Sequence, residues 1–136
     1  MKVYIFGNGN ISFDDFEEFY LNPLKGLVTD KQVSYIICDF RGVDTLAMEY
    51  LKSTCQNVTI AHIGERPRYI PDKYRTKVSQ WNIVGGFEDD QSRDQFAIDQ
   101  CTHFIARDFN SNEKRKSGTL KNIELCKSLG KIEITS

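Results

Sequence analysis

Short apolar runs alternate with helical periods along the whole chain, and this alternation limits the possible folds more than any other feature. The runs occupy residues 3–6, 33–38, 58–62, 82–84, 103–106 and 132–134. Most are continuously apolar, as expected for strands covered on both faces, and helices between such strands imply right-handed crossovers. The sequence therefore predicts a single-domain, Rossmann-like α/β fold. It should contain a doubly wound, mainly parallel sheet of about five to six strands with helices on both faces.

The expected helices lie between these runs. A first helix begins with a capping-box pattern at Ser12 and carries an apolar stripe of Phe13, Phe16 and Tyr20. Further helices are expected at residues 43–51, 89–101 and 120–130. The segment 43–51 follows the i, i+3, i+4, i+7 spacing most closely and is the clearest helix of the chain.

The composition is that of a soluble globular protein, with 40% hydrophobic and 27% charged residues among 136. A formal net charge of −1 gives no general reason for binding a polyanion, so we do not expect nucleic acid as a partner. No apolar run approaches the length of a membrane span, and the initial run is too short for a signal peptide. We expect a cytoplasmic protein without membrane contact.

The cysteines and histidines give no sign of a metal site. The four cysteines are widely spaced, without a C-x-x-C pair, as is typical of buried free thiols in a reducing compartment: Cys38, Cys55, Cys101 and Cys126. The two histidines, His62 and His103, follow no metal-ligand spacing. We expect neither a metal nor a cofactor.

Residues that follow the strands are the candidates for ligand binding, because doubly wound sheets bind ligands beyond the carboxyl ends of their strands. Gly7, Asn8 and Gly9 follow the first strand. The two glycines permit close approach of the backbone to a ligand, although Gly-Asn-Gly is also a common turn.

A second candidate group follows the second strand. Gly42 lies at the start of the helix expected at 43–51, and the first amides of this helix are suited to a phosphate or ribose. Arg41 would then supply the counter-charge, and Asp44 would accept a hydrogen bond from a hydroxyl group of the ligand. In the alternative, Asp44 complements the helix dipole and Arg41 is solvated.

The third group is Ser117, Gly118 and Thr119, directly before the last long helix. These residues are small, and the first helical amides lack an intrahelical acceptor, so we expect an anion, most simply a phosphate, on the amides of Leu120 and Lys121. Ser and Thr are also common N-caps, which leaves a capped helix without a ligand as the alternative.

Two further charged residues are catalytic candidates. Arg93 lies near the inward stripe of the helix at 89–101, and an inward arginine requires an anionic partner, which is Asp39, Asp44 or a ligand phosphate. Glu65 lies in a loop and is the best spare carboxylate, although most exposed loop glutamates are merely solvated.

Three blocks together resemble the SLOG superfamily of nucleotide-binding, Rossmann-like domains: residues 41–51, residues 93–106, and Ser117–Thr119 with Gly130 and Lys131. This superfamily includes the cytokinin-activating phosphoribohydrolases and the DNA-processing protein DprA. The resemblance covers nearly the whole chain and implies one SLOG-like nucleotide-binding domain over residues 1–136. In the phosphoribohydrolases, a glycine-rich loop and a Gly-Gly-x-Gly-Thr-x-x-Glu motif hold a nucleoside monophosphate, and a helix arginine acts with the motif's glutamate.

The match to that motif is incomplete. Gly42, Gly118, Thr119 and Arg93 correspond to family positions, but Asn122 stands where the family has its catalytic glutamate. The nearby Glu124 is offset by two residues, about 200° around a helix, and should face away from that point.

The resemblance and the loop residues together predict a sensor or sequestering module that binds a nucleotide or nucleotide-derived ligand, as a homodimer. The alternative is an enzyme that cleaves or transfers at the N-glycosidic bond of a nucleoside monophosphate. In that enzyme Arg93 would act with a carboxylate from Glu65, Asp44 or Glu124.

Overall fold

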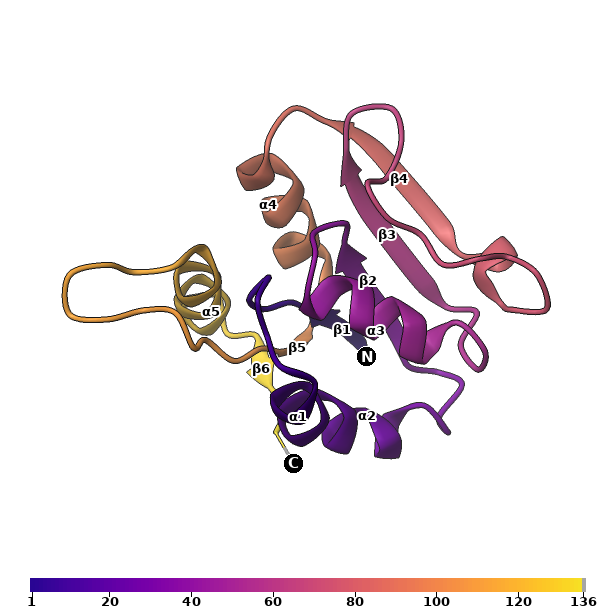
Figure 1. Cartoon of the computed structure of the whole chain (residues 1–136), viewed down its shortest axis with the longest axis horizontal. Coiled ribbons are helices and arrows are strands. Elements are labelled where there is room, and N and C mark those ends of the chain that lie inside the picture. The colour runs from indigo at the N-terminus through magenta and orange to yellow at the C-terminus, as the bar shows by residue number, and fades with distance from the viewer. Residues whose placement is uncertain (136) are drawn as a thin grey trace.

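The six strands of the computed structural model, which describes residues 1–135, form one fully parallel sheet (Figure 1). They are β1 (Lys2–Ile5), β2 (Ser34–Cys38), β3 (Val58–Ile63), β4 (Asn82–Phe87), β5 (His103–Ile105) and β6 (Ile132–Glu133). The order across the sheet is β4-β3-β2-β1-β5-β6. The chain thus winds outward from β1 in both directions, and the predicted fold class is confirmed.

The helices lie between the strands, as the alternation predicts. They are α1 (Phe13–Phe16), the π-helical turn η1 (Glu17–Leu21), α2 (Asn22–Leu27), α3 (Val43–Leu51), the 3-10 turn η2 (Val78–Gln80), α4 (Asp90–Gln100) and α5 (Gly118–Ser128). Ser12 caps α1, because its hydroxyl accepts the amide proton of Asp15 at 3.2 Å. Phe13 departs from the expected stripe: it is 60% exposed and packs on the ring of Phe16 at the end of the helix.

Alternate residues of each strand supply two separate cores. Val3 and Ile5 face the core formed with α1, η1, α2 and α3, whereas Tyr4 and Phe6 face the core formed with α4 and α5. This division follows from the two-residue period of a strand. It explains why the strand sequences are continuously apolar, since both faces of the sheet are covered.

β4 is longer than its sequence indicated. The run at 82–84 continues through Gly85 and Gly86 to Phe87, with a register shift opposite Ala61 and Ile63. A Cβ atom on Gly85 would lie 2.1 Å from the ring of His62, so the strand can pair here because this residue has no side chain. Gly85 and Gly86 therefore belong to β4, although two consecutive glycines are typical of a turn.

The four cysteines are buried and free, as predicted. Within the part of the chain that the structure describes, no helix has the length and apolarity that a membrane crossing needs.

Candidate functional site

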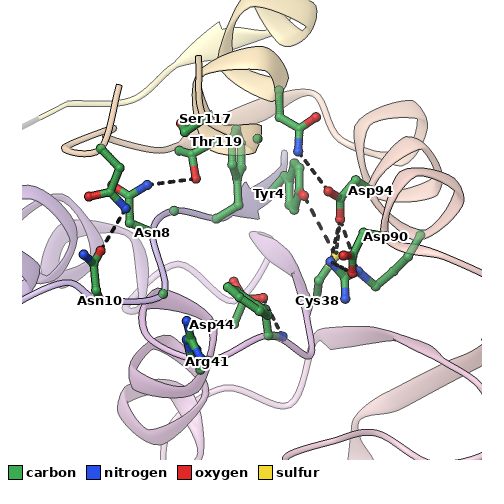
Figure 2. Close-up of a pocket in the computed structure, with 18 of the residues that line it drawn as sticks. Tyr4, Asn8, Asn10, Cys38, Arg41, Asp44, Asp90, Asp94, Ser117 and Thr119 are labelled. Atoms are coloured by element: carbon green, nitrogen blue, oxygen red, sulfur yellow. Dashed lines mark hydrogen bonds and ion pairs between the residues drawn. The ribbon is translucent and has the colours of Figure 1, made fainter. Parts of the chain in front are cut away.

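A cavity of about 550 Å³ opens at the carboxyl edge of the sheet (Figure 2). Its walls come from the loops after β1 and β2, the start of α4, and the loop that leads into α5. The structure brings together most of the residues that the sequence proposed for ligand binding or catalysis: Gly7, Asn8, Gly9, Arg41, Asp44, Arg93, Ser117, Gly118 and Thr119. Figure 2 shows Ser117 and Thr119 facing Arg41 and Asp44 across it.

Gly42 and Glu65 are not among the residues that line this cavity. Gly42 has a φ of +75°, and a Cβ atom there would lie 2.4 Å from the carbonyl oxygen of Asn8. The amide of Val43 donates to that same oxygen at 3.3 Å. The loop after β1 thus lies against the start of α3, where we expected a phosphate or ribose to bind. Glu65 is exposed in the connection after β3.

Asn8 joins two loops that are about a hundred residues apart in the chain. Its amide nitrogen donates to Asp108 at 3.1 Å and to the Thr119 hydroxyl at 3.3 Å, and its oxygen accepts the Phe109 amide at 2.7 Å. The buried Asn8 side chain therefore positions the loop before α5, and its polar atoms already have protein partners.

Asp108 organises the start of α5, and the sequence analysis missed it. Its carboxylate accepts the Ser117 hydroxyl at 2.7 Å and the amides of Asn110 and Ser111 at 3.2 Å. Burial acts against ionisation, but the hydrogen bonds from Ser111, Ser117 and Asn8 outweigh it and lower the pKa of Asp108 to about 2. Its position just beyond β5 is the signal that would have identified it.

The amides at the start of α5 differ from those expected to hold an anion. Leu120 donates to the Ser117 hydroxyl at 3.0 Å, and Lys121 donates to the Ser117 carbonyl at 3.1 Å. Lys121 lies one turn into the helix and so has an intrahelical acceptor. Among residues 1–135, no acceptor is found for the amides of Gly118 and Thr119, and the space beside the Gly118 Cα is open. An anion at this helix would therefore meet Gly118 and Thr119.

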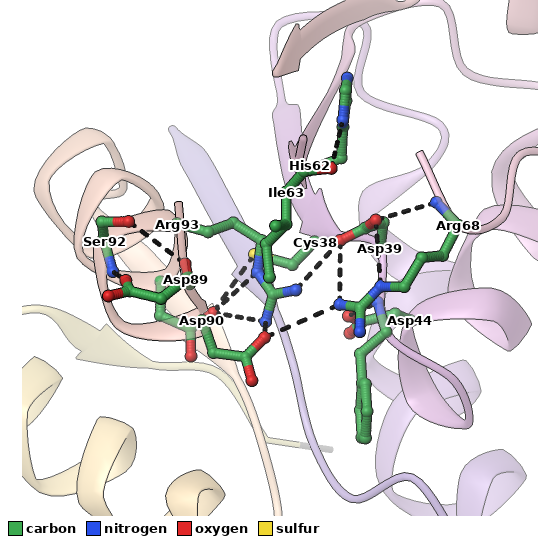
Figure 3. Close-up of polar contacts among 12 residues, drawn as sticks. Cys38, Asp39, Asp44, His62, Ile63, Arg68, Asp89, Asp90, Ser92 and Arg93 are labelled. Carbon is green, nitrogen blue, oxygen red and sulfur yellow. Dashed lines mark hydrogen bonds and ion pairs between the residues drawn. The ribbon is translucent and has the colours of Figure 1, made fainter. Parts of the chain in front are cut away.

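Arg93 is held by three carboxylates in the interior of the site (Figure 3). Its guanidinium group donates to Asp39 at 3.0 Å, to Asp94 at 3.0 and 3.1 Å, and lies 3.1 Å from Asp90. Only 5% of the Arg93 side chain is exposed. Of the partners that the sequence left open, the structure places Asp39 on Arg93.

Asp39 lies between Arg93 and Arg68 (Figure 3). It accepts the backbone amide of Arg68 at 2.9 Å and two guanidinium hydrogen bonds at 3.2 and 3.3 Å. Burial opposes the charge on Asp39, but the hydrogen bonds from Arg68 outweigh it and lower the pKa of this carboxyl group. Asp90 and Asp94, which line the cavity, and Asp39 beside them thus set three carboxylates against the guanidinium groups of Arg93 and Arg68.

Two other groups on the floor are neutral. Burial raises the pKa of Asp44 to about 8, although its carboxyl group accepts the amide of Phe40 at 2.9 Å. Burial likewise raises the pKa of the Cys38 thiol, which contacts Asp94 at 3.7 Å and the Tyr4 hydroxyl at 3.9 Å. Neither group is a strong base or a thiolate nucleophile at neutral pH.

Asn122 and Glu124 lie as the helical rotation predicts. Asn122 lines the cavity and donates to Asp94 at 3.0 Å. Glu124 is exposed and forms an ion pair with Lys116. The uncharged amide of Asn122 thus stands where the phosphoribohydrolase motif has its glutamate.

The rim of the cavity is basic and aromatic. Arg41 and Phe40 both line the cavity, and the Arg41 guanidinium carbon lies 5.4 Å from the centre of the Phe40 ring. Arg115 also lines the cavity, from the long loop that protrudes beside α5 in Figure 1. Over the described range 1–135, neither Arg41 nor Arg115 has a carboxylate within 4.0 Å. Their charges are therefore available to a ligand.

No protein-family model and no curated protein matches the chain. Among solved structures, DNA processing protein A from Helicobacter pylori matches it with a TM-score of 0.69 and 18% sequence identity, over 98% of this chain and 63% of that one. The chain has the fold of DNA processing protein A. At this identity the match shows a shared fold alone, so membership of the SLOG superfamily stays a prediction. The chain spans less than two-thirds of the length of this neighbour.

This comparison overturns two predictions. We expected a nucleotide-derived small ligand, with N-glycosidic cleavage as the alternative, and did not expect nucleic acid as a partner. The structure of this neighbour was determined to explain how that protein binds single-stranded DNA. Net charge is a weak criterion for such a partner, because it sums paired carboxylates and unpaired arginines over the whole chain. The homodimer and the cytoplasmic location stay predictions.

Proposed function

We propose that this chain binds single-stranded DNA across the carboxyl edge of its sheet. The observation that carries the proposal is a pair of exposed arginines that line the cavity and have no carboxylate partner in the described range: Arg41 from the loop after β2, and Arg115 from the loop before α5. Proteins that bind single strands combine such cationic walls with aromatic rings on which bases stack. Phe40, beside Arg41, supplies a ring at the rim.

The charges favour a strand along the rim over a phosphate on the floor. Around Arg93, the lining residues Asp90 and Asp94 and the adjacent Asp39 set three carboxylates against two guanidinium groups, those of Arg93 and Arg68, so this part of the cavity would repel a phosphate. The rim has positive charge without such compensation. A backbone that crosses the rim can therefore place its phosphates on arginines, while a base enters the cavity.

The start of α5 gives a second phosphate contact. The free amides of Gly118 and Thr119 border the cavity, and the positive end of the helix dipole lies at the same place. Lys114 and Arg115 precede them on the exposed loop and add attraction for an approaching strand.

Fluorescence anisotropy with a labelled oligo-dT of about 12 nucleotides, a length within the usual site sizes, tests the proposal. We expect Arg41→Ala and Arg115→Ala each to weaken binding about tenfold and to reduce the salt slope by about 0.7. Lys31→Ala is the matched control, because Lys31 precedes β2 at the opposite edge of the sheet. An RNA strand of equal length and a DNA duplex show which nucleic acid is preferred. An equal loss of affinity in the Lys31 variant would mean that DNA binds by general charge attraction and not at the cavity.

Gly118→Asp tests the contact with α5. A carboxylate there repels a phosphate, yet the open space beside Gly118 and the favourable helix dipole leave folding undisturbed. We expect a loss of at least about tenfold in affinity, with Gly118→Ala close to wild type. Unchanged affinity of Gly118→Asp would remove α5 from the site, and absence of strand binding by the unmodified chain would refute the proposed function.

A further inference from the structure

An aromatic and cationic cluster lies next to the cavity and takes no part in its lining. Arg107 and Phe109 follow β5, and Phe19 lies in η1, so the cluster joins segments about 90 residues apart. We propose that Phe19, Arg107 and Phe109 form a base-stacking platform for a further nucleobase of the strand bound at the cavity. This inference rests on the proposed function and extends its site to a second nucleotide position.

The three side chains pack on one another at the surface. The Phe19 and Phe109 ring centres are 5.6 Å apart at an interplanar angle of 57°. The Arg107 guanidinium carbon lies 4.3 Å from the Phe19 ring centre and 5.9 Å from that of Phe109. Phe109 remains 41% exposed, and Arg107 is exposed as well. A flat ring beside a cation thus faces solvent.

Neither sheet core accounts for this arrangement. Phe109 belongs to neither of the two buried clusters, and its ring meets Phe19 at the edge of the first. Within the described part of the chain, Arg107 has no carboxylate within 4.0 Å. An exposed phenylalanine under an unpaired arginine is suited to a ligand with a flat face and a negative charge, which a nucleotide provides.

The platform is fixed to the wall of the cavity. The Phe109 amide donates to Asn8 at 2.7 Å, and the next residue, Asn110, lines the cavity and donates to Asn10 at 2.9 Å. On the other side, the Arg107 amide donates to the Tyr20 hydroxyl at 3.0 Å, and that hydroxyl donates to the Phe6 carbonyl at 2.7 Å. The backbone on both sides of the platform is therefore held in place before a ligand arrives.

The continuity with the cavity identifies the occupant. Adjacent residues of one loop, Phe109 and Asn110, belong to the platform and to the cavity wall. A strand whose phosphates lie on Arg115 can therefore pass directly to Arg107 and stack a base on Phe109. A mononucleotide in the cavity would leave the platform empty, so the platform predicts that affinity increases with strand length.

The test compares Phe109→Ala with the unmodified chain on oligo-dT of about 3 and about 12 nucleotides, measured by fluorescence anisotropy. We expect the variant to lose about tenfold in affinity for the longer strand and little for the shorter one. Tyr74→Ala is the matched control: Tyr74 is 72% exposed with Arg75 at 5.2 Å, but lies in the connection between β3 and β4, outside the cavity lining.

An abasic series locates the stacked base. Abasic sites placed one by one along the longer strand should weaken binding to the unmodified chain at one position, and this effect should disappear in Phe109→Ala. Phe109→Trp keeps a ring and should retain affinity. Its added indole fluorescence, measured against the unmodified chain with its buried Trp81, should be quenched by DNA if a base stacks there.

The outcomes separate the two proposals. Strand binding that is equal in Phe109→Ala and the unmodified chain at both lengths would refute the platform and leave the cavity site standing. The same conclusion would follow if DNA left the added fluorescence of Phe109→Trp unchanged. An equal loss in Tyr74→Ala would also refute the platform. Failure of the unmodified chain to bind either strand would refute the proposed function and the platform with it.

Discussion

Arg93 of α4 donates a hydrogen bond of 3.0 Å to Asp39 at the end of β2, 54 residues away in the chain. Both side chains are almost fully buried, and two more carboxylates, on Asp90 and Asp94, lie on the same guanidinium group. Arg93 therefore offsets the mutual repulsion of these three carboxylates. It also fixes α4 against the carboxyl edge of the sheet.

We expect Arg93→Met to lower the free energy of unfolding by about 3–5 kcal/mol, because it leaves the buried carboxylate of Asp39 without one of its two arginines. Urea denaturation at pH 7 measures the change. Arg41→Met serves as the control and should stay within about 0.5 kcal/mol of wild type, because Arg41 is exposed. Similar losses in the two variants would show that the ion pairs around Arg93 contribute little to stability.

The pH dependence of stability should reveal the neutral Asp44. Burial raises its pKa to about 8, against about 3.9 in an unfolded chain, so between these values the folded state holds a proton that the unfolded state lacks. Stability should therefore fall as pH rises from about 4 to 8, by up to about 1.4 kcal/mol per pH unit. Asp44→Asn should abolish this decline and come closest to wild type below about pH 4, where the Asp44 carboxyl group is protonated in both the folded and the unfolded state.

Asp108→Asn provides the opposite signature. Because the hydrogen bonds on Asp108 lower its pKa to about 2 despite burial, its contribution is present above about pH 4 and is lost as pH falls toward 2. The variant should leave the decline between pH 5 and 8 intact. Thermal unfolding across the pH range measures both variants, and an unchanged decline in Asp44→Asn would contradict the assignment of a neutral carboxyl group.

Asn122→Glu introduces the residue that the phosphoribohydrolase motif would have at this position. In this chain the new carboxylate would lie beside Asp94, to which Asn122 now donates at 3.0 Å. We expect the free energy of unfolding to fall by about 1–3 kcal/mol at pH 8 and to recover partly at pH 5, because like charges repel and a hydrogen bond is lost. Asn122→Gln keeps the donor and should lose less. Equal stability of the two variants at pH 8 in urea denaturation would argue against this repulsion.

Local signals in the sequence were enough to predict the alternation of strands and helices, helix starts near Ser12 and Ser117, and the edge of the sheet at which the cavity opens. These features depend on signals within a few residues: apolar runs for strands, and the serines at positions 12 and 117 whose hydroxyls cap helices. The exception among the strands is β4, where two glycines in succession indicate a turn. There the deciding contact, Gly85 with His62, joins different strands.

Which charges remain available for a ligand depends on how the folded chain pairs them. Arg93 and Arg41 are equally basic in the sequence, but folding surrounds Arg93 with carboxylates from the end of β2 and from α4, whereas no carboxylate of the described residues pairs with Arg41. The same holds for Asn8, which folding joins to Asp108, and for Phe19, which it joins to Phe109. These partners are 54 to 100 residues apart, so their pairing depends on the packing of the whole sheet, and no local pattern encodes it.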